Sequence, residues 1–471
     1  MHVRALSVMK ASPSSQKKVA VVGAGAAGLV AARELRRENI DVTVFERGNE
    51  VGGTWVYSGA RQVGQGEEEE RAYHIHSSVY DTLRVNLPRE IMGYSDYPFA
   101  SSLCSDGGDD RRYCSHREVL RYLQNFARDE DIEALIQKNT LVISASPTEN
   151  ENETNWKVTH RTKGREEKVE ETFDALVVCN GHFEVPRLIA SRGIEAFPGQ
   201  QIHSRDYKRN DVDVFVDKSV LVVGTGPSGD DLSREVSKVA RNVYWSGRLF
   251  TRIEPERLLR IKDSLNENVS CLSNVSRVDS DGTVHFDRAE DLPVKVDTIL
   301  WCTGYEYQVP FLDPALEIST SSGRIEPLYE HLFHPKFGSK LSFIGLGFRI
   351  LPFPFFEIQS KWVAKCIAGG SALPSKAEML ADAEDFYGNL QKEGIREEMT
   401  RKFSFSFSHY FSLSLSLSLS LSLSFSFRFS FRGTDLFFLC SPPIRLHGWH
   451  PVGLSPADRL KARYGGLQGI A

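Results

Sequence analysis

The stretch that decides the fold is Val19-Ala-Val-Val-Gly23-Ala-Gly25-Ala-Ala-Gly28-Leu-Val-Ala-Ala-Arg-Glu-Leu35. Its small and β-branched apolar residues at the start are typical of a buried parallel strand. That strand ends in Gly-x-Gly-x-x-Gly, and strong helix formers continue over 27–38. A second strand, Asp41-Val-Thr-Val-Phe-Glu46, follows directly and ends in an acid. This order predicts a βαβ unit with a glycine turn at its centre.

Each glycine of that turn has a physical reason to be there. Gly23 permits the tight turn, Gly25 lets a pyrophosphate approach the backbone, and Gly28 lets the helix pack close to the strand. The pyrophosphate then meets the free N–H groups of the helix N-terminus, and Glu46 is placed to accept hydrogen bonds from a ribose diol. We predict a dinucleotide site, with a purely structural βαβ unit as the alternative. The predicted contacts are Gly23, Ala24, Gly25, Ala26, Ala27, Gly28, Glu46 and Arg47.

The pattern recurs in Ser219-Val-Leu-Val-Val-Gly224-Thr-Gly226-Pro-Ser-Gly229-Asp-Asp-Leu, with a further strand expected over 241–245. Where the first copy has Glu46, the second has Ser246-Gly-Arg248 and no acid. An acid on a ribose hydroxyl suits FAD or NAD, whereas a hydroxyl and a guanidinium suit the 2′-phosphate of NADP. We therefore predict FAD at the first site and NADP(H) at the second, with Arg248 as an ordinary surface residue left open. The predicted NADP(H) contacts are Gly224, Thr225, Gly226, Pro227, Ser228, Gly229, Ser246 and Arg248.

The composition of the whole chain sets limits on its class. A length of 471 residues allows two or three domains, and a net charge of −5 gives no reason to expect a nucleic-acid partner. The seven cysteines form no C-x-x-C pair and have no metal-ligand spacing, which favours a reducing compartment and no metal. No stretch has the ~20 apolar residues of a transmembrane helix, and the first 16 residues lack the apolar core of a signal peptide. We expect a cytoplasmic protein and leave its oligomeric state open.

Local patterns predict several further elements. A helix with a capping box is expected over 115–129, because Ser115 precedes it and Glu118 stands three residues later. Period-two stretches at 156–160 and 170–175 predict antiparallel strands. Buried strands that run into glycine turns are expected over 175–182, 294–305 and 341–347, and a helix over 357–369.

The glycine turns near 181 and 304 flank the second nucleotide motif. We therefore predict an α/β protein with two Rossmann-type dinucleotide-binding domains, in which the NADP domain is inserted in the FAD domain. The expected ranges are 1–16 for a disordered extension, 17–187 and 306–400 for the FAD-binding domain, 188–305 for the NADP-binding domain, and 401–471 for a tail.

The tail differs in composition from everything before it. From Phe403 to Arg432 serine alternates with phenylalanine or leucine almost without interruption. An amphipathic strand of that length would be an aggregation hazard. A CT dinucleotide repeat encodes alternating leucine and serine, so we interpret the stretch as translated intron and 433–471 as unrelated sequence behind it. The tail is expected to be aberrant and disordered.

A third motif is Phe197-Pro-Gly199-Gln-Gln-Ile-His203-Ser-Arg-Asp-Tyr207. It matches F-x-G-x-x-x-H-x-x-x-[Y/F], the identifying motif of flavin-containing monooxygenases, at every specified position. Together with both nucleotide motifs and Gly52-Gly53-Thr54-Trp55, it makes the chain resemble that family over roughly residues 17–400. The stretches 83–92 and 94–98 resemble the plant sulfur-oxygenating branch, whose known members act on methylthioalkyl glucosinolates. The auxin-forming branch is a poorer match.

The resemblance implies a mechanism and roles for residues. NADPH would reduce FAD, O2 would add at flavin C4a, and the hydroperoxide would oxygenate a soft nucleophile, the sulfur of a small thioether or a nitrogen. Asn86 matches the family asparagine beside the flavin ring, whose amide can bond the hydroperoxide or retained NADP. Gly53, Thr54 and Trp55 are implied as cofactor contacts. His203 is interpreted as structural support at the domain crossing, with an ordinary loop histidine as the alternative.

The resemblance leaves alternatives open. Family members continue past Lys402 with a segment that finishes the FAD domain, and this chain has the repeat there instead. An N-oxygenase or auxin-type enzyme of the same family is one alternative, and an inactive truncated splice product is another. A pyridine nucleotide–disulfide reductase is disfavoured, because the chain lacks a closely spaced cysteine pair.

Overall fold

The computed structural model falls into two compact units, Met1–Phe403 and Ser404–Ala471, which are considered separately. The expectations for 1–15 and for most of the tail lie outside the described residues. Within the second unit, strands β20 (Phe427–Arg432) and β21 (Asp435–Cys440) pair antiparallel. The structure describes residues 16–59, 72–73, 77–99, 108–150, 153–321, 323–347, 350–394, 427–432 and 435–440.

The first sheet is built around β1 (Lys18–Val22), in which Val19, Ala20 and Val21 are fully buried. It has the order β18-β19-β7-β1-β2-β3, parallel except where β18 meets β19. The partners of β1 come from distant parts of the sequence, since β7 precedes the second nucleotide motif and β19 follows it. The other strands are β2 (Asp41–Phe45), β3 (Ile136–Gln137), β7 (Ala175–Val178), β18 (Phe333–His334) and β19 (Gly338–Phe343).

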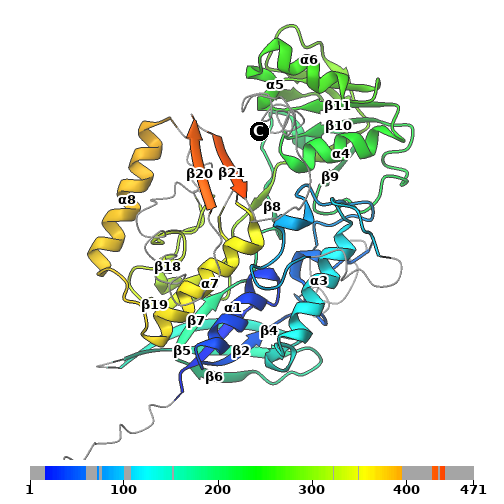
Figure 1. Cartoon of the computed structure of the whole chain (residues 1–471). Helices are drawn as coiled ribbons and strands as arrows, with labels where there is room; N and C mark the ends of the chain where they lie inside the picture. Colours follow the sequence, from blue (N-terminus) through cyan, green and yellow to red (C-terminus); the bar gives the residue numbers. More distant parts are fainter. Residues whose placement is uncertain are drawn as a thin grey trace, which may run out of the picture. The chain divides into compact units, whose positions relative to one another are not determined.

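Two helices pack side by side on this sheet. Helix α1 (Ala26–Arg37) follows the first glycine turn, and α7 (Pro352–Ala368) lies along it (Figure 1). The helix predicted over 357–369 is therefore confirmed, but it begins earlier, because Pro352 occupies the first turn, where proline's missing N–H costs nothing. It ends at Gly369, whose φ of 84° is the left-handed conformation common at helix C-termini.

The second sheet has the order β12-β11-β10-β16-β9 and is parallel throughout. Helix α4 (Pro227–Ser237) follows β10 across the second glycine turn, as predicted. The two parallel sheets confirm the predicted fold class of two Rossmann-type domains, one inserted in the other. The strands are β9 (Gln200–His203), β10 (Ser219–Val223), β11 (Asn242–Ser246), β12 (Val269–Leu272) and β16 (Thr298–Trp301).

The stretch expected as one strand over 294–305 is divided between two sheets, which corrects the prediction. Strand β15 (Val294–Lys295) pairs antiparallel with β14 (Thr283–Phe286), and only β16 joins the parallel sheet. The chain crosses from one sheet to the other at Asp297. There the Asp297 carboxylate accepts the N–H of Ser219 at 2.8 Å, which fixes the entry into the parallel sheet. Apolar residues stand on both sides of Asp297, with Val294 and Val296 before it and Ile299 and Leu300 after it, so periodicity alone does not reveal the break.

The two crossings between the sheets pair with each other. Strand β8 (Val185–Pro186) follows the glycine turn at Gly181 and pairs antiparallel with β17 (Tyr305–Glu306), which follows Gly304. The chain therefore leaves the first sheet and returns to it through one two-stranded connection. This is the arrangement expected when one domain is inserted in another.

The predicted antiparallel strands are confirmed, but the predicted capping box is wrong. Strands β4 (Thr140–Asn150), β5 (Glu153–Thr162) and β6 (Val169–Phe173) form an antiparallel sheet, and the hydrophobic core formed with the first sheet includes the fully buried Trp156.

At helix α3 (His116–Asp129), Ser115 is the N-cap residue but its hydroxyl caps nothing. The Asp109 carboxylate accepts the Ser115 N–H at 2.9 Å, and the Glu118 carboxylate accepts from Asp109 N–H and Arg121 instead. Asp109, which lies outside the helix, therefore accepts the Ser115 N–H that the capping box assigns to Glu118.

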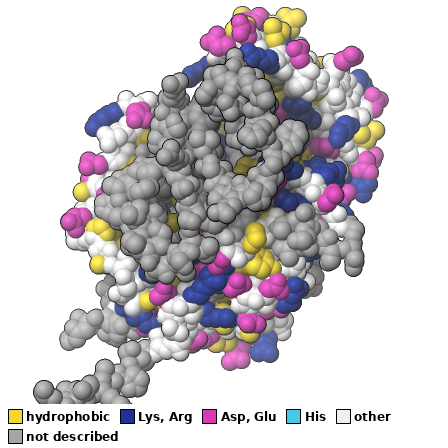
Figure 2. Space-filling view, in the orientation of Figure 1, with side chains coloured by type: hydrophobic (Ala, Val, Ile, Leu, Met, Phe, Trp, Pro, Cys, Tyr) yellow, Lys and Arg dark blue, Asp and Glu magenta, His cyan; other side chains and the backbone are white. Residues whose placement is uncertain are grey.

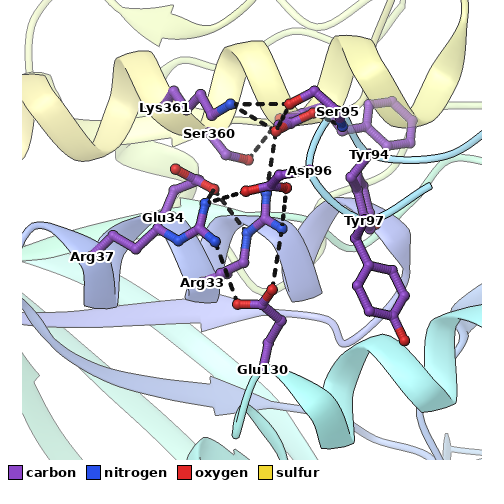
Figure 3. A network of polar contacts seen from close by, with 12 residues as sticks. Arg33, Glu34, Arg37, Tyr94, Ser95, Asp96, Tyr97, Glu130, Ser360 and Lys361 are labelled. Atoms are coloured by element: carbon purple, nitrogen blue, oxygen red, sulfur yellow. Dashed lines mark hydrogen bonds and ion pairs between the residues drawn. The ribbon is translucent and has the colours of Figure 1, made fainter. Parts of the chain in front are cut away.

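A buried ionic network ties α1 to α7 (Figure 3). The Arg33 side chain on α1 is 2% exposed and donates to Glu34 at 2.8 Å, to Asp96 at 2.8 Å and to Glu357 of α7 at 3.2 Å. Glu357 is also 2% exposed, and it accepts the N–H of Ser95 at 2.7 Å. Removing Arg33 would leave the buried Glu34 and Glu357 with only the more exposed Arg37 and Lys361 as cations, so Arg33 binds the two helices as a unit.

The rim of the network is exposed. Arg37 is 43% exposed and pairs with Asp96 at 2.8 Å and with Glu130 at 3.5 Å (Figure 3). Such exposed pairs contribute little stability because water screens them. The stabilising part of the network is therefore its interior around Arg33.

The remaining elements lie outside the two parallel sheets. Acidic and basic side chains are interspersed over the described part of the face shown in Figure 2. None of the helices within the described ranges has both the length and the apolar character needed to cross a membrane. The remaining bounds are β13 (Val275–Val278), α5 (Arg248–Arg252), α6 (Pro255–Asp263), α8 (Lys376–Lys392), and the 3-10 turns η1 (Gly53–Trp55), η2 (Arg89–Ile91), η4 (Glu133–Leu135), η5 (Ile194–Ala196) and η6 (Pro314–Leu316).

Candidate dinucleotide-binding sites

The first glycine turn is fixed by close backbone contacts. Gly23 has a φ of +104°, and a Cβ there would lie 2.5 Å from the Cys179 carbonyl oxygen. A Cβ at Gly28 would lie 1.8 Å from the carbonyl oxygen of Gly23. Both distances are far inside van der Waals contact, so the outer two glycines are required by the packing of α1 on β1.

The middle glycine of the same turn is not required by the fold. A Cβ at Gly25 would meet only the backbone of Gly53, with Cα at 3.5 Å, which is ordinary contact. The Gly52 N–H donates to the Ala24 carbonyl at 3.0 Å, which brings the η1 turn beside the N-terminus of α1. The structure thus brings Gly53, one of the predicted cofactor contacts, beside the first glycine turn.

Glu46 fixes the turn from the end of β2. Its side chain is buried, and its carboxylate oxygens accept the N–H groups of Ala24 and Gly48, each at 2.8 Å. Burial raises the pKa of Glu46, while the two N–H donors act in the opposite direction. A carboxylate can accept about four hydrogen bonds, so acceptor capacity remains for a ligand. Arg47 points to another partner, Glu184, at 2.7 Å.

The second glycine turn repeats this geometry. Gly224 has a φ of +120°, with a Cβ position 2.2 Å from the Cys302 carbonyl oxygen, and a Cβ at Gly229 would lie 1.9 Å from the Gly224 carbonyl oxygen. At Gly226 a Cβ would meet no atom within 4 Å. Again the outer glycines serve the fold, and the middle glycine leaves the backbone open to a ligand.

The two helix N-termini complement an anion. Gly25 and Gly226 are the N-cap residues of α1 and α4. The first turn of α1 contains no acidic side chain, and that of α4 contains Asp230, which is paired with Arg234 at 3.1 Å. The N–H groups of such a turn have no partner within the helix, and the helix dipole favours negative charge there. Both sites therefore fit the pyrophosphate of a dinucleotide.

The residues after β11 differ in what they can offer. Ser246 is fully buried, and its hydroxyl donates to the Ser273 carbonyl, so its proton is already engaged within the fold. Arg248 is exposed at the start of α5. Gly247 lies between them, and a Cβ there would lie 2.8 Å from Thr225 Cγ2 of the glycine turn. Arg248 is therefore the better placed of the two residues to meet an added phosphate.

The third motif packs where the two sheets meet. A Cβ at Gly199 would lie 2.1 Å from the Asp297 carbonyl oxygen and 2.7 Å from the ring of Phe197. With Phe197 in this place, position 199 must therefore be glycine. His203 Nε2 donates to the Gly304 carbonyl at 3.1 Å, and His203 Nδ1 accepts the Arg205 N–H. Burial lowers the pKa of His203, which favours this neutral form. Tyr207 is almost fully buried in the core around β10. The contact with Gly304 places His203 at the crossing, as its interpretation as structural support requires.

Asn86 lies in an irregular segment, 77–86, that touches the first site. Ser77 Oγ donates to the Thr54 carbonyl at 2.6 Å, and at the far end Val85 N–H donates to the Cys114 carbonyl at 3.0 Å. Asn86 itself is exposed, and its side chain has no hydrogen-bond partner among the described residues. An amide so placed is available to a ligand.

A sequence model of the family described as flavin-binding monooxygenase-like matches residues 16–257 and 254–413 of the chain. Both glycine turns, the third motif and Asn86 lie within the matched ranges. The chain belongs to the flavin-binding monooxygenase-like family.

This flavin-binding monooxygenase has close relatives in plants. It is 42% identical over 388 residues to flavin-containing monooxygenase FMO GS-OX-like 2 of Arabidopsis thaliana, covering 82% of each chain. It is also 42% identical over 391 residues to FMO GS-OX4 of the same plant, covering 83% of this chain and 82% of the relative.

Solved structures give the same grouping. The S-allyl-L-cysteine S-oxygenase of Allium sativum is 36% identical, has a TM-score of 0.75, and is matched over 87% of this chain and 89% of its own. Tmm from a Pelagibacter strain, 24% identical with a TM-score of 0.67 over 80% of this chain and 81% of its own, shares the fold.

Several residues of the monooxygenase that position these sites were missed from the sequence. The hydroxyl of Tyr94, which is 1% exposed, donates to the Ala26 carbonyl in the first turn of α1 at 2.7 Å. Lys208, Tyr80 and Glu357 likewise connect segments far apart in the chain. One signal was present for Glu357, which is the only acid in the otherwise apolar stretch 351–358. The others are ordinary residues of irregular segments, where no periodicity points to a partner.

Proposed function

We propose that this chain is an NADPH-dependent S-oxygenase of small thioethers. In the reaction NADPH, a proton, O2 and a thioether give NADP+, water and a sulfoxide, so one oxygen atom goes to sulfur and the other to water. The observation that carries the proposal is the similarity to the Allium S-oxygenase over nearly the whole of both chains. A bound flavin would supply the activation of O2, and the protein would bind, orient and exclude water.

The flavin site of this proposal is the first glycine turn with its neighbours. The N-terminus of α1 and the open backbone at Gly25 are suited to the FAD pyrophosphate, and Glu46 to the ribose. The segment 77–86, which carries Asn86, is hydrogen-bonded to Thr54 near the same end of α1. The proposed FAD contacts are Gly23, Ala24, Gly25, Ala26, Ala27, Gly28, Glu46, Arg47, Gly53, Thr54 and Trp55.

The nicotinamide site of this proposal is the second glycine turn, with Gly224, Thr225, Gly226, Pro227, Ser228, Gly229 and Arg248. Ser246 stays in the proposal as a residue that shapes the site, because its hydroxyl is engaged with Ser273. The boundaries at 188 and 305 are kept as the proposed domain limits. They are supported by the second sheet, whose five strands all lie within 200–301.

Arg248→Ala is expected to weaken NADPH binding tenfold to a hundredfold and to leave NADH nearly unchanged. The guanidinium would make charge-assisted hydrogen bonds to the 2′-phosphate, worth about 1.5–3 kcal/mol. Dissociation constants for NADP+ and NAD+ in the flavin-loaded protein measure the effect. Arg252→Ala, at the other end of the same short helix, is the matched control and should change neither constant. Equal losses for both nucleotides in Arg248→Ala would contradict the assignment.

Asn86→Ala is expected to leave NADPH oxidation running while diverting the oxygen to hydrogen peroxide. Loss of one hydrogen bond in the ternary site, about 0.5–1.5 kcal/mol, should lower the ratio of sulfoxide to NADPH consumed by up to about tenfold. The measurement is product, peroxide and NADPH in the same reaction. Asn86→Ser keeps a polar group and should recover part of the coupling. An unchanged ratio in Asn86→Ala would make Asn86 an ordinary loop residue.

Substrate class is tested by a panel. The purified chain would be given NADPH with S-allyl-L-cysteine, with a simple dialkyl sulfide or with a tertiary amine, and the products identified by mass. Sulfoxide formation without N-oxide supports the proposal. N-oxide as the main product would favour the N-oxygenase alternative, and a chain that takes up no flavin would favour the inactive splice product.

We also propose a cytoplasmic location. In the described part of the first unit, Cys114, Cys179, Cys271, Cys302 and Cys366 are all free and buried. Burial raises the pKa of each thiol, which keeps it protonated and unreactive. Free thiols of this kind are typical of a reducing compartment.

A further inference from the structure

Both ends of segment 77–86 contact residues of the part of the chain that forms the first site. Ser77 is bonded to the Thr54 carbonyl, and Thr54 Oγ1 lies 3.3 Å from Ser78 Oγ. At the other end Arg84 forms a β-bridge with Ser115, next to Asn86. Both anchors are in the part of the chain that builds the first sheet.

The middle of the same segment is held by helix α4 of the second sheet. The Tyr80 hydroxyl donates to the Asp231 carboxylate, and the Thr82 hydroxyl donates to Glu235 at 3.0 Å. Asp231 and Glu235 are one helical turn apart, so they stand on the same face of α4. The N-cap of that helix is Gly226, the open glycine of the second site.

Further contacts join the middle of segment 77–86 to Tyr207 and Lys208, which follow strand β9 of the second sheet. Tyr80 is only 5% exposed, and its ring stands edge-to-face against Tyr207, with the centroids 5.3 Å apart. Lys208 Nζ donates to the Val79 carbonyl at 3.1 Å and also to that of Ser77, and Lys208 O accepts the Asp81 N–H at 3.0 Å. Movement of α4 relative to the first sheet must therefore move or strain the segment that ends at Asn86.

We infer that the Tyr80–Asp231 hydrogen bond couples nucleotide binding at the N-terminus of α4 to the position of Asn86. This inference rests on the proposed function, which puts NADP(H) at the second glycine turn. A nucleotide bound there holds α4, Asp231 then holds Tyr80, and the segment presents Asn86 to the first site. Tyr80 and Asp231 are positioning residues that act through Asn86 and touch no substrate.

Coupling between two sites is reciprocal. If bound NADP+ orders segment 77–86 through Tyr80, loss of the bond between this segment and α4 must weaken NADP+ binding by the same factor. A bond to a charged acceptor is strong enough for this, and we expect a loss of about threefold to tenfold in NADP+ affinity. Flavin retention should be unaffected, because the Tyr80 side chain bonds Asp231 and packs on Tyr207, neither of which is proposed to bind FAD.

The experiment uses the full chain loaded with flavin and the variants Tyr80→Phe, Asp231→Asn and their combination. Each single variant should raise the NADP+ dissociation constant about threefold to tenfold, and the combination should be no worse than either one, because both remove the same bond. Tyr113→Phe, which alters a tyrosine that is 42% exposed, is the matched control and should change nothing.

A structural readout accompanies the affinities. NADP+ should slow amide hydrogen exchange over 77–86 in the parent protein, and Tyr80→Phe should abolish that slowing while its flavin absorbance and thermal midpoint stay at the parent values. If NADP+ protects 77–86 equally in the parent and in both single variants, with equal affinities, the coupling is disproved. If the parent binds no NADP+, or Gly226→Val binds it as well as the parent, the proposed nicotinamide site itself is disproved. Should Tyr80→Phe lose its fold, Asp231→Asn at the surface of α4 decides the question.

Discussion

Gly25→Val is expected to give a folded protein that contains almost no flavin. The backbone at Gly25 faces only Gly53, at 3.5 Å from a Cβ, so the fold has room for the β-carbon. The branched methyl groups would occupy the space that a pyrophosphate needs at the N-terminus of α1. The measurement is the ratio of flavin absorbance to protein in the purified variant, together with its circular dichroism.

Two matched variants separate the ligand effect from a folding effect. Gly28→Ala should lose flavin and stability together, because its Cβ would lie 1.8 Å from the Gly23 carbonyl oxygen. Gly226→Val, at the equivalent open position of the second turn, should keep its flavin and lose affinity for NADP+. Parent-like flavin content in Gly25→Val would mean that FAD binds elsewhere.

Arg33→Met is expected to lower the free energy of unfolding by about 3–5 kcal/mol. Methionine has a similar length but no charge, so Glu34 and Glu357 would remain buried with only the more exposed Arg37 and Lys361 to compensate them. The variant would also lose the contact of the guanidinium with the Phe126 ring, whose centroid is 4.9 Å away. Denaturant unfolding of the parent and the variant, followed by circular dichroism, measures the difference.

The control is the neighbouring arginine on the rim of the same network. Arg37 is 43% exposed, so Arg37→Met should cost no more than about 1 kcal/mol. The contrast between the two variants is the test, since both remove one arginine from the same helix. Similar losses in both would show that burial of Arg33 does not set the strength of the network.

The glycine turns could be predicted because their constraints are local. Gly23 and Gly28 are forced by atoms within the same βαβ unit and the neighbouring strand, and the spacing of the glycines records this in the sequence. The same holds for Gly224 and Gly229. Both parallel sheets, and the insertion of one within the other, followed from these repeats and from the two glycine turns that flank the second motif.

The polar contacts could not be predicted, because their partners lie outside the local pattern that each residue belongs to. Ser246 follows a strand in the position of a ligand contact, yet its hydroxyl is engaged with Ser273. Ser115 and Glu118 have the spacing of a capping box, but Asp109 accepts the N–H that the box would satisfy. Arg33 looks like any polar residue of an amphipathic helix until Glu357 is brought against it. In each case a tertiary contact overrides a sound local rule.

The antiparallel pair β8 and β17 also has a consequence for synthesis of the chain. Strands β1, β2 and β7 leave the ribosome early, but their neighbour β19 and the covering helix α7 are made only after the whole inserted sheet. Domains generally fold as units during translation, so the inserted domain can close while the first sheet still waits for its last strand. Until residue 368 has emerged, the side of α1 that packs on α7 has nothing to cover it in the nascent chain. The domain that is begun first is thus the last to be completed.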